Sequence, residues 1–258
     1  MKKKEREAQI LRMLQKTGSV TVFDLSRMMD VSTVTIRSDL KDLEGDGVLL
    51  RTRGGAVLSN RLQRSTTLPR TANGGEKQAI ARAARELIQA DTWIFLGSGT
   101  TCLALAEELR DFPVNVMTNN LAVAGVLAPS SRGQVIMPGG TVFGSSNPPF
   151  LYGDLLHSSL GSVALSQAFL GVSGIDANFG YSLSNSVECS IFSRLRQISR
   201  EVVILADASK FGKTSFMGAG PVSAADTIVT AGSVPKACLE WCSSAGVHVI
   251  RAEEEPQE

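Results

Sequence analysis

Residues 31–44, VSTVTIRSDLKDLE, have the pattern of a helix with one apolar stripe and a polar outer surface. Ser32 offers an N-cap hydroxyl, and apolar side chains then recur at Ile36, Leu40 and Leu43. The remaining surface carries hydroxyls and cations, at Thr33, Thr35, Arg37, Ser38 and Lys41. Such groups bind phosphate oxygens and base edges, which indicates a DNA recognition helix. An ordinary solvent-facing amphipathic helix has the same pattern, so the flanking sequence has to distinguish the two.

The residues before this stretch predict two more helices. Apolar side chains recur along 6–16, and Gly18 follows where a helix end commonly needs a left-handed residue. Thr21 and Asp24 have the spacing of a capping box and begin a short second helix. Its buried side is expected to hold Leu25, Met28 and Met29. Only a few residues then separate it from Ser32, as in a helix-turn-helix.

A basic hairpin is predicted after the recognition helix. Gly45-Asp46-Gly47 ends the helix, and residues 48–53 form a strand. A turn at Gly54-Gly55 leads to a returning strand. The hairpin carries Arg51 and Arg53, whose side chains can approach phosphates or a minor groove. Three helices and a basic hairpin in this order predict a winged helix-turn-helix.

Composition and charge fit a two-domain globular chain. The 258 residues are 43% apolar, enough for two modest cores, and no run approaches the roughly 20 apolar residues of a membrane span. The first ten residues, MKKKEREAQI, do not resemble a signal peptide, so a cytoplasmic protein without membrane contact is expected. Residues 1–70 hold fourteen Lys and Arg against eight Asp and Glu, a net of +6, which leaves −5 of the total +1 for the rest. A basic head on an acidic body favours polyanion binding by the first domain.

The second part of the chain alternates short apolar runs with helical stretches. Predicted strands are 93–96, 114–117, 135–137, 168–172, 202–206, 227–230 and 247–250, and predicted helices are 76–88, 102–109, 121–127, 186–197 and 236–242. Short apolar strands with crossover helices indicate a doubly wound, parallel α/β sheet. The predicted domains are a winged helix over 1–58, a linker over 59–75, an α/β domain over 76–251 and an acidic tail over 252–258.

Polar loops follow five of these strands, where ligands of such sheets bind. Gly97-Ser98-Gly99-Thr100-Thr101 offers hydroxyls and backbone N–H groups at a helix N-terminus, which suits a phosphate. The other loops are Thr118-Asn119, Gly139-Gly140, Gly174-Ile175-Asp176 and Asp207-Ala-Ser-Lys-Phe-Gly212. One such loop alone is usually a plain turn. Five together predict a binding site.

Two parts of the chain resemble one known family. ILRMLQKTGSVTVFDLSRMMDVSTVTIRSDLKDLEGDGVLLRTRGGAVL is similar to the N-terminal domain of DeoR-family transcriptional regulators, most diagnostically in TIRSDLKDLE and R-x-R-G-G-A. Ser38 stands where family members commonly have a second basic residue. The rest, to about residue 250, resembles the family's sensor domain, most strongly at the DASKFG run from Asp207.

The resemblance implies an effector site in a Rossmann-like domain similar to sugar-phosphate isomerases. Ser98, Gly99, Thr100 and Thr101 would hold the phosphate of a phosphorylated sugar. Sugar hydroxyls or a carbonyl would meet Asp176, Glu188, Asp207 and Lys210, and the expected site further includes Lys77, Thr118, Asn119, Gly139 and Gly140. Leu96 stands where many family members have an acidic residue, and Phe192 where they often have a basic one. The segment GSSNPPF over 144–150 is also unusual for the family.

The resulting prediction is a regulator, in the first instance a repressor of a carbohydrate operon. It would bind double-stranded operator DNA as a homo-oligomer, a dimer or tetramer, with affinity set by a phosphorylated sugar, and would need no cofactor or metal. Cys238 and Cys242 share a helical face, but no second cysteine pair or paired histidine supports a metal site, so reduced, buried thiols are expected.

Three alternatives remain open. The chain could be a sugar-phosphate isomerase with a DNA-binding head, in which Asp207 or Glu188 is the general base and Lys210 stabilises an enediolate. It could be a binding module that assembles other regulators without sensing a ligand. Asp207 and Lys210 could also be no more than a surface ion pair near a turn.

Overall fold

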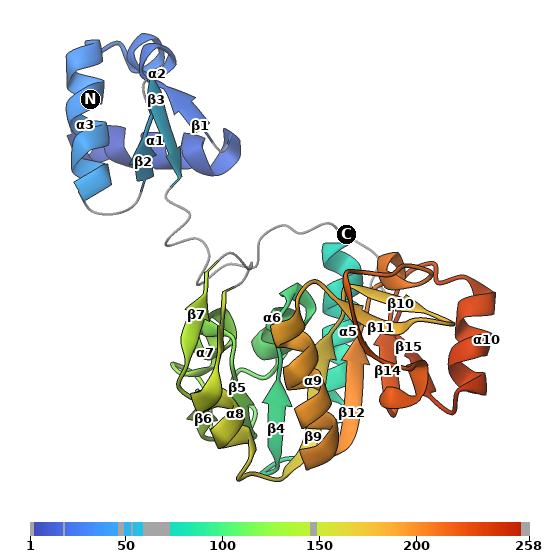
Figure 1. The fold of residues 1–258 in the computed structure, drawn as a ribbon. Coiled ribbons are helices and arrows are strands. Elements are labelled where there is room, and N and C mark those ends of the chain that lie inside the picture. Colours follow the sequence, from blue (N-terminus) through green and yellow to red (C-terminus); the bar gives the residue numbers. More distant parts are fainter. Residues whose placement is uncertain are drawn as a thin grey trace. The chain divides into compact units, whose positions relative to one another are not determined.

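The computed structural model describes residues 3–17, 19–45, 49–52, 54–58, 73–144 and 149–253 (Figure 1). The chain divides into two compact units, Met1–Pro69 and Arg70–Glu258. The predictions for residues 18, 46–48, 53, 59–72, 145–148 and 254–258 fall outside the described residues. They include Arg53, most of the linker and the end of the acidic tail.

The first unit is built from three helices and a small sheet. Its elements are α1 (Lys3–Thr17), β1 (Ser19–Thr21), α2 (Val22–Met29), α3 (Thr33–Gly45), β2 (Leu49–Arg51) and β3 (Gly55–Leu58). The strands form an antiparallel sheet in the order β1-β3-β2. This succession confirms the predicted winged helix-turn-helix. Strand β1 was not predicted, because three residues are too few to show an alternating pattern.

The core of this unit follows the predicted apolar stripes with one exception. Among the buried residues are Leu25, Met29, Ile36, Leu40 and Leu43. The prediction for Met28 was wrong, since its side chain is 50% exposed. Met28 and Met29 lie three and four residues after Leu25, on either edge of the same stripe, and the helix turns Met29 into the core.

Local hydrogen bonds begin α2 and α3 where the sequence predicted. The Asp24 N–H donates to Thr21 Oγ1 at 3.0 Å, and the Thr35 N–H donates to Ser32 Oγ at 3.1 Å. Each bond satisfies a backbone donor that the first helical turn leaves without a partner. A side chain just before each helix therefore fixes its start.

The hairpin differs from its prediction at Gly55. This residue is the first of β3 and pairs with Thr21 of β1, while the turn is closed by the Thr52 N–H, which donates to the Gly55 carbonyl at 3.0 Å. A Cβ on Gly55 would lie 1.9 Å from the Val20 backbone oxygen. Glycine is therefore required here by the close approach of β1 rather than by the turn.

The second unit contains a parallel sheet of seven strands in the order β15-β14-β12-β9-β4-β5-β6. These strands are β4 (Trp93–Leu96), β5 (Asn115–Thr118), β6 (Val135–Ile136), β9 (Leu165–Gly171), β12 (Ser199–Leu205), β14 (Thr227–Thr230) and β15 (His248–Arg251). All seven predicted strands are present. β9 and β12 begin three residues earlier than predicted, because their first three residues, most of them polar, still pair in register.

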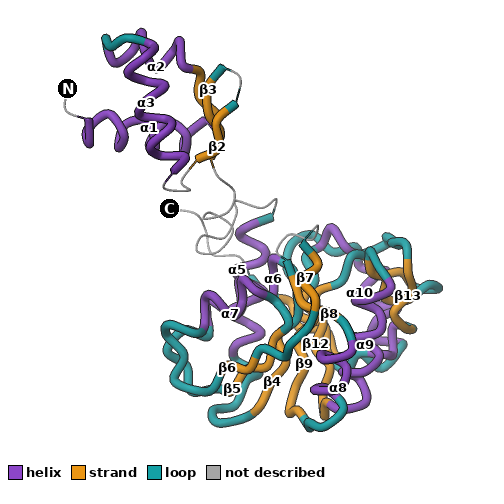
Figure 2. Tube along the Cα trace, turned by 60° about the vertical axis from the view of Figure 1, so that its left-hand side comes forward, coloured by secondary structure: helices purple, strands orange, loops and turns teal. Residues whose placement is uncertain are grey.

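Helices cover both faces of this sheet, as the doubly wound prediction requires. The helices are α5 (Gly74–Arg85), α6 (Thr100–Glu108), α7 (Leu121–Leu127), α8 (Asp154–Leu160), α9 (Ser186–Ile198) and α10 (Lys236–Ser244). Figure 2 shows α5, α6 and α7 on one side of the sheet and α8, α9 and α10 on the other. Helix α5 begins at Gly74, two residues before its predicted start, so Gly74 and Gly75 are helical.

Two antiparallel additions were not predicted. β7 (Thr141–Phe143) pairs with β8 (Phe150–Tyr152), and β10 (Gly174–Asp176), β11 (Gly180–Leu183) and β13 (Met217–Gly220) form a separate sheet. Two short 3-10 helices, η1 (Ala208–Lys210) and η2 (Val222–Ala224), lie among the later loops. The segment 174–176 was predicted as a polar loop at the end of a parallel strand, but it is itself β10. Its three residues carry no period that would identify a strand.

Candidate functional site

The outer surface of α3 presents the predicted DNA-binding side chains. Arg37, Ser38 and Lys41 are exposed, and Thr33 and Thr35 are half-buried. The hydroxyls of Ser32 and Thr35 share a hydrogen bond of 2.9 Å at the helix cap. The cations are therefore presented to solvent, whereas these two hydroxyls also hold the helix start.

Helix α3 is fixed to its neighbours by charged contacts. Asp39 is 2% exposed and accepts two hydrogen bonds from the Arg6 guanidinium of α1, at 2.8 Å and 3.0 Å. The Arg51 N–H of the wing donates to Glu44 Oε1 at 2.9 Å. These contacts attach α3 to α1 and to the wing.

A cleft of about 260 Å³ lies at the carboxyl ends of the parallel strands in the second unit. Its lining residues are Lys77, Ser98, Gly99, Thr100, Thr101, Gly171, Val172, Ser173, Leu183, Ser184, Glu188, Leu205 and Lys210. The structure thus brings together seven predicted effector residues from four separate stretches of sequence. Ser173 and Ser184 were missed.

The loop after β4 forms one wall of the cleft. Gly99 has a φ of 111°, a conformation that strongly favours glycine, and it is the N-cap of α6. The first turn of α6 therefore starts at the cleft, and its backbone N–H groups and hydroxyls suit an anion.

Lys77 reaches the cleft from the first turn of α5 and is held there by Asp207. Its Nζ lies 3.1 Å from Asp207 Oδ2, and Asp207 is 1% exposed. Asp207 also accepts the Ser209 N–H at 3.0 Å, the Ser209 hydroxyl and the Asn73 side-chain amide at 3.3 Å. Burial raises the pKa of Asp207, but the bonds from Ser209 and Lys77 and the charges of Lys77 and Lys210 lower it below its ordinary value.

Asp207 and Lys210 are therefore not a surface ion pair. Asp207 is buried and bound to Lys77, and it does not line the cleft. Lys210 lines the cleft and forms no ion pair within the described residues. Within the DASKFG run, Lys210 lines the cleft, whereas Asp207 is buried and holds Lys77 in place.

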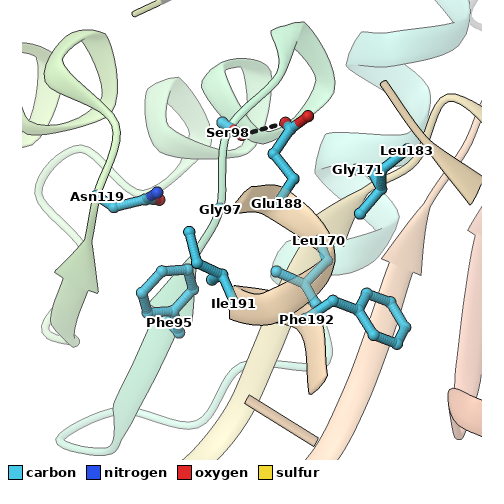
Figure 3. A pocket seen from close by; sticks show the side chains of 10 residues that line it. All are labelled: Phe95, Gly97, Ser98, Asn119, Leu170, Gly171, Leu183, Glu188, Ile191 and Phe192. Carbon is cyan, nitrogen blue, oxygen red and sulfur yellow. Dashed lines mark hydrogen bonds between the residues drawn. The ribbon is translucent and has the colours of Figure 1, made fainter. Parts of the chain in front are cut away.

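Glu188 joins the β4 loop to the start of α9. Its Oε1 accepts from Ser98 Oγ at 3.1 Å, and its Oε2 accepts from Ser184 Oγ at 3.1 Å and Asn185 Nδ2 at 2.6 Å. Figure 3 shows the Ser98 bond above the lining of a smaller cavity. Asn185 was missed, although Asn185 and Glu188 have the three-residue spacing of a helix cap.

The smaller cavity, of about 30 Å³, adjoins the cleft through shared residues. Its lining comprises Phe95, Gly97, Ser98, Asn119, Leu170, Gly171, Leu183, Glu188, Ile191 and Phe192 (Figure 3). Asn119 donates to the Leu151 carbonyl at 3.1 Å, and its Oδ1 has no hydrogen-bond partner within the described residues. Phe192 packs against Tyr181, with ring centroids 5.9 Å apart, so this departure from the family resemblance lies in the core.

The remaining predicted effector residues do not line either cavity. Thr118 is fully buried and accepts the Asn120 N–H at 3.0 Å. Gly139 and Gly140 lie between β6 and β7. Asp176 accepts the N–H groups of Phe179 and Asn178, which lower its pKa and hold the turn between β10 and β11.

The described residues contain no group of three His, Cys, Asp or Glu side chains arranged to hold a metal ion. The four cysteines are unbonded and buried, as predicted. No described helix has the length and apolar content needed to cross a bilayer. The polar lining of the cleft comprises the Lys77 and Lys210 ammonium groups, the N-terminus of α6, hydroxyls and the Glu188 carboxylate.

Both units match described protein families. Residues 6–62 match the DeoR-like helix-turn-helix domain, and residues 72–231 match the DeoR C terminal sensor domain. A putative aga operon transcriptional repressor of Escherichia coli O157:H7 is 35% identical, over 95% of this chain and 93% of that protein. An L-fucose operon activator of Haemophilus influenzae is 30% identical over 95% and 98%. A glycerol-3-phosphate regulon repressor of Escherichia coli K12 is 29% identical over 93% and 95%.

Proposed function

The chain belongs to the DeoR family of transcriptional regulators, and from this premise we propose that it represses a carbohydrate operon until a phosphorylated sugar binds its sensor domain. The observation that carries the proposal is the cleft that Lys77 and Lys210 line together with the N-terminus of α6. These groups attract a phosphate dianion. Relatives named as repressors of the aga operon and the glycerol-3-phosphate regulon support the same class of ligand.

The rest of the cleft suits the sugar. Ser173, Ser184 and Glu188 offer oxygens that accept hydrogen bonds from sugar hydroxyls. A volume of about 260 Å³ is near the lower end for small-molecule sites, so a phosphorylated monosaccharide suits the cleft better than a dinucleotide. Effector and operator must stabilise different states of the protein, so each weakens binding of the other.

A thermal-shift screen tests the ligand class. A ligand at 100 times its dissociation constant stabilises the protein by about 2.7 kcal/mol. Phosphorylated sugars should raise the melting temperature, whereas the parent sugars and inorganic phosphate at equal concentration should not. Lys210→Met should abolish the shift, and Lys213→Met, an exposed lysine outside the cleft, should preserve it. A shift that survives Lys210→Met would contradict this site.

A mobility-shift assay on the chain's own promoter region tests repression. Tight, sequence-specific binding is expected without ligand, and release is expected on adding the sugar phosphate found in the screen. Binding that strengthens with the ligand would reassign the protein as an activator or a co-repressed regulator. Absence of specific binding in every condition would overturn the proposal.

Variants of α3 assign the DNA contacts. Arg37→Ala should reduce discrimination between operator and random DNA by about 1–3 kcal/mol if the guanidinium reads a base. Lys41→Ala should lower the salt dependence by about one phosphate contact with little change in specificity. Arg132→Ala, an exposed cation of the sensor unit, is the control. Equal weakening on both DNAs would reassign Arg37 to a phosphate.

We also propose a homo-oligomer, because paired recognition helices read repeated half-sites. Light scattering after size exclusion should give the mass of a dimer or tetramer, and a monomer would contradict this.

The isomerase alternative needs a carboxylate free to take a proton, whereas Glu188 accepts three side-chain hydrogen bonds and Asp207 does not line the cleft. Turnover of sugar phosphates that Asp207→Asn abolishes would favour the enzyme instead.

A further inference from the structure

Val34 is an apolar side chain on the otherwise polar outer face of α3. It is 71% exposed, whereas Ile36, Leu40 and Leu43 of the same helix are buried. A single exposed apolar residue is common on protein surfaces and needs no explanation by itself. A β-branched residue is also a weaker helix former than Lys, Glu or Gln, so neither helix stability nor solubility accounts for it.

The position of Val34 is more informative than its exposure. It is the second residue of α3, so it lies in the first helical turn. The exposed residues Arg37, Ser38 and Lys41 follow it at three, four and seven positions, which puts all four side chains on one stripe. In a helix-turn-helix the N-terminal residues of the second helix reach the base edges. Val34 is therefore at the end of the stripe that enters the major groove first.

The chemistry of valine restricts what it can read there. Its two methyl groups form no hydrogen bonds, and the C5-methyl of thymine is the apolar group on the major-groove edge of the bases. The neighbouring hydroxyls of Ser32 and Thr35 are hydrogen-bonded to each other at the helix cap.

We propose that Val34 contacts the C5-methyl group of one thymine in each operator half-site. This contact makes Val34 a determinant of sequence specificity beside the hydrogen-bonding cation Arg37. The inference rests on the proposed binding of operator DNA through α3. Ser38 stands where related proteins commonly have a second basic residue. With Val34 in contact with a thymine, the helix face around Ser38 would read DNA by apolar as well as polar contacts.

Replacement of single thymines by deoxyuridine tests the contact, because it removes the methyl group and preserves every hydrogen-bonding group of the base. An operator is first selected from random duplexes by the full-length protein. Each thymine of one half-site is then replaced in turn, and dissociation constants are measured at one salt concentration for wild type, Val34→Ala and Met28→Ala. Met28, half-exposed on α2, is the matched apolar control.

One replacement should weaken wild-type binding about fourfold, the value expected for one buried methyl group. The same replacement should have no effect on Val34→Ala and should keep its full effect on Met28→Ala. Wild-type binding that is insensitive to every replacement, or a methyl effect that persists in Val34→Ala, would overturn the inference alone. Failure to enrich any sequence would overturn both the inference and the proposed function. Circular dichroism of Val34→Ala should match wild type, since the side chain is exposed.

Discussion

Gly55→Ala should destabilise the winged helix while leaving the sensor unit intact. The added Cβ would lie 1.9 Å from the backbone oxygen of Val20 and 2.9 Å from the Thr21 Cα. Both atoms belong to the backbone of β1, so no side chain can rotate to make room. Strands β1 and β3 must separate, and the pairing of Thr21 with Gly55 is lost.

The cost is at the upper end of that for overfilled cores, about 3 kcal/mol. For a domain of this size each kcal/mol lowers the melting temperature by roughly 4–8 °C, so a drop of about 12–24 °C is expected. Far-ultraviolet circular dichroism follows the helices of both units. Tryptophan fluorescence follows only the sensor unit, because the two tryptophans of the chain, Trp93 and Trp241, both belong to it.

Gly54→Ala is the matched control for this prediction. A Cβ at Gly54 meets nothing within 4 Å, so the same change one residue earlier should alter stability by no more than about 0.5 kcal/mol. In Gly55→Ala an early transition should appear in circular dichroism while the fluorescence midpoint stays at its wild-type value. Equal melting of the two glycine variants would refute the packing argument, and a matching fall in the fluorescence midpoint would refute the independence of the units.

Three further outcomes follow from the sensor unit. The pKa of Asp207 is lowered in the folded protein, so the stability that its ionised form contributes is complete above its ordinary pKa near 4. That stability is lost as the pH falls through the pKa of the folded state. Lys77→Met should therefore cost stability at neutral pH and progressively less below about pH 4, and a cost independent of pH would contradict the ion pair. Glu188→Gln replaces charge-assisted hydrogen bonds by neutral ones at a half-buried position. Urea unfolding followed by fluorescence should therefore show that the free energy of unfolding falls by about 1–2 kcal/mol. An unchanged free energy of unfolding would contradict the role of these bonds. Burial raises the pKa of Cys102 and Cys242 to about 12. An aromatic disulfide reagent at neutral pH should therefore label neither thiol before denaturation. Rapid labelling of either thiol in the native protein would contradict their burial.

Sequence alone predicted the features that depend on neighbouring residues. The caps at Thr21 and Ser32 and the apolar stripe through Leu40 are local, and the structure confirms them. Helix 121–127 and strand 227–230 match their predicted bounds, because apolar runs between polar breaks mark buried elements well. The succession of the seven parallel strands and of the helices predicted between them could therefore be read without any long-range contact.

The contacts that build the cleft were not predictable in this way. Lys77 and Asp207 are 130 positions apart, and no local pattern indicates that the buried partner of Asp207 is Lys77 rather than Lys210. Gly55 shows the same limit, since a glycine pair after a basic strand reads as a turn. Only the neighbouring strand β1 reveals that one of the two glycines is needed for close packing.

The first turn of α5 is also the place where the polypeptide coming from the winged helix enters the described part of the sensor unit. There Asn73 donates to Asp207, Glu76 Oε2 accepts the Ala208 N–H at 3.2 Å, and Lys77 lines the cleft. A chain has one covalent path between its two units, and this path ends at residues that touch the cleft and its support. An anion that drew Lys77 away from Asp207 would therefore act on the first turn of α5, where Asn73 and Glu76 also bind the segment that follows β12.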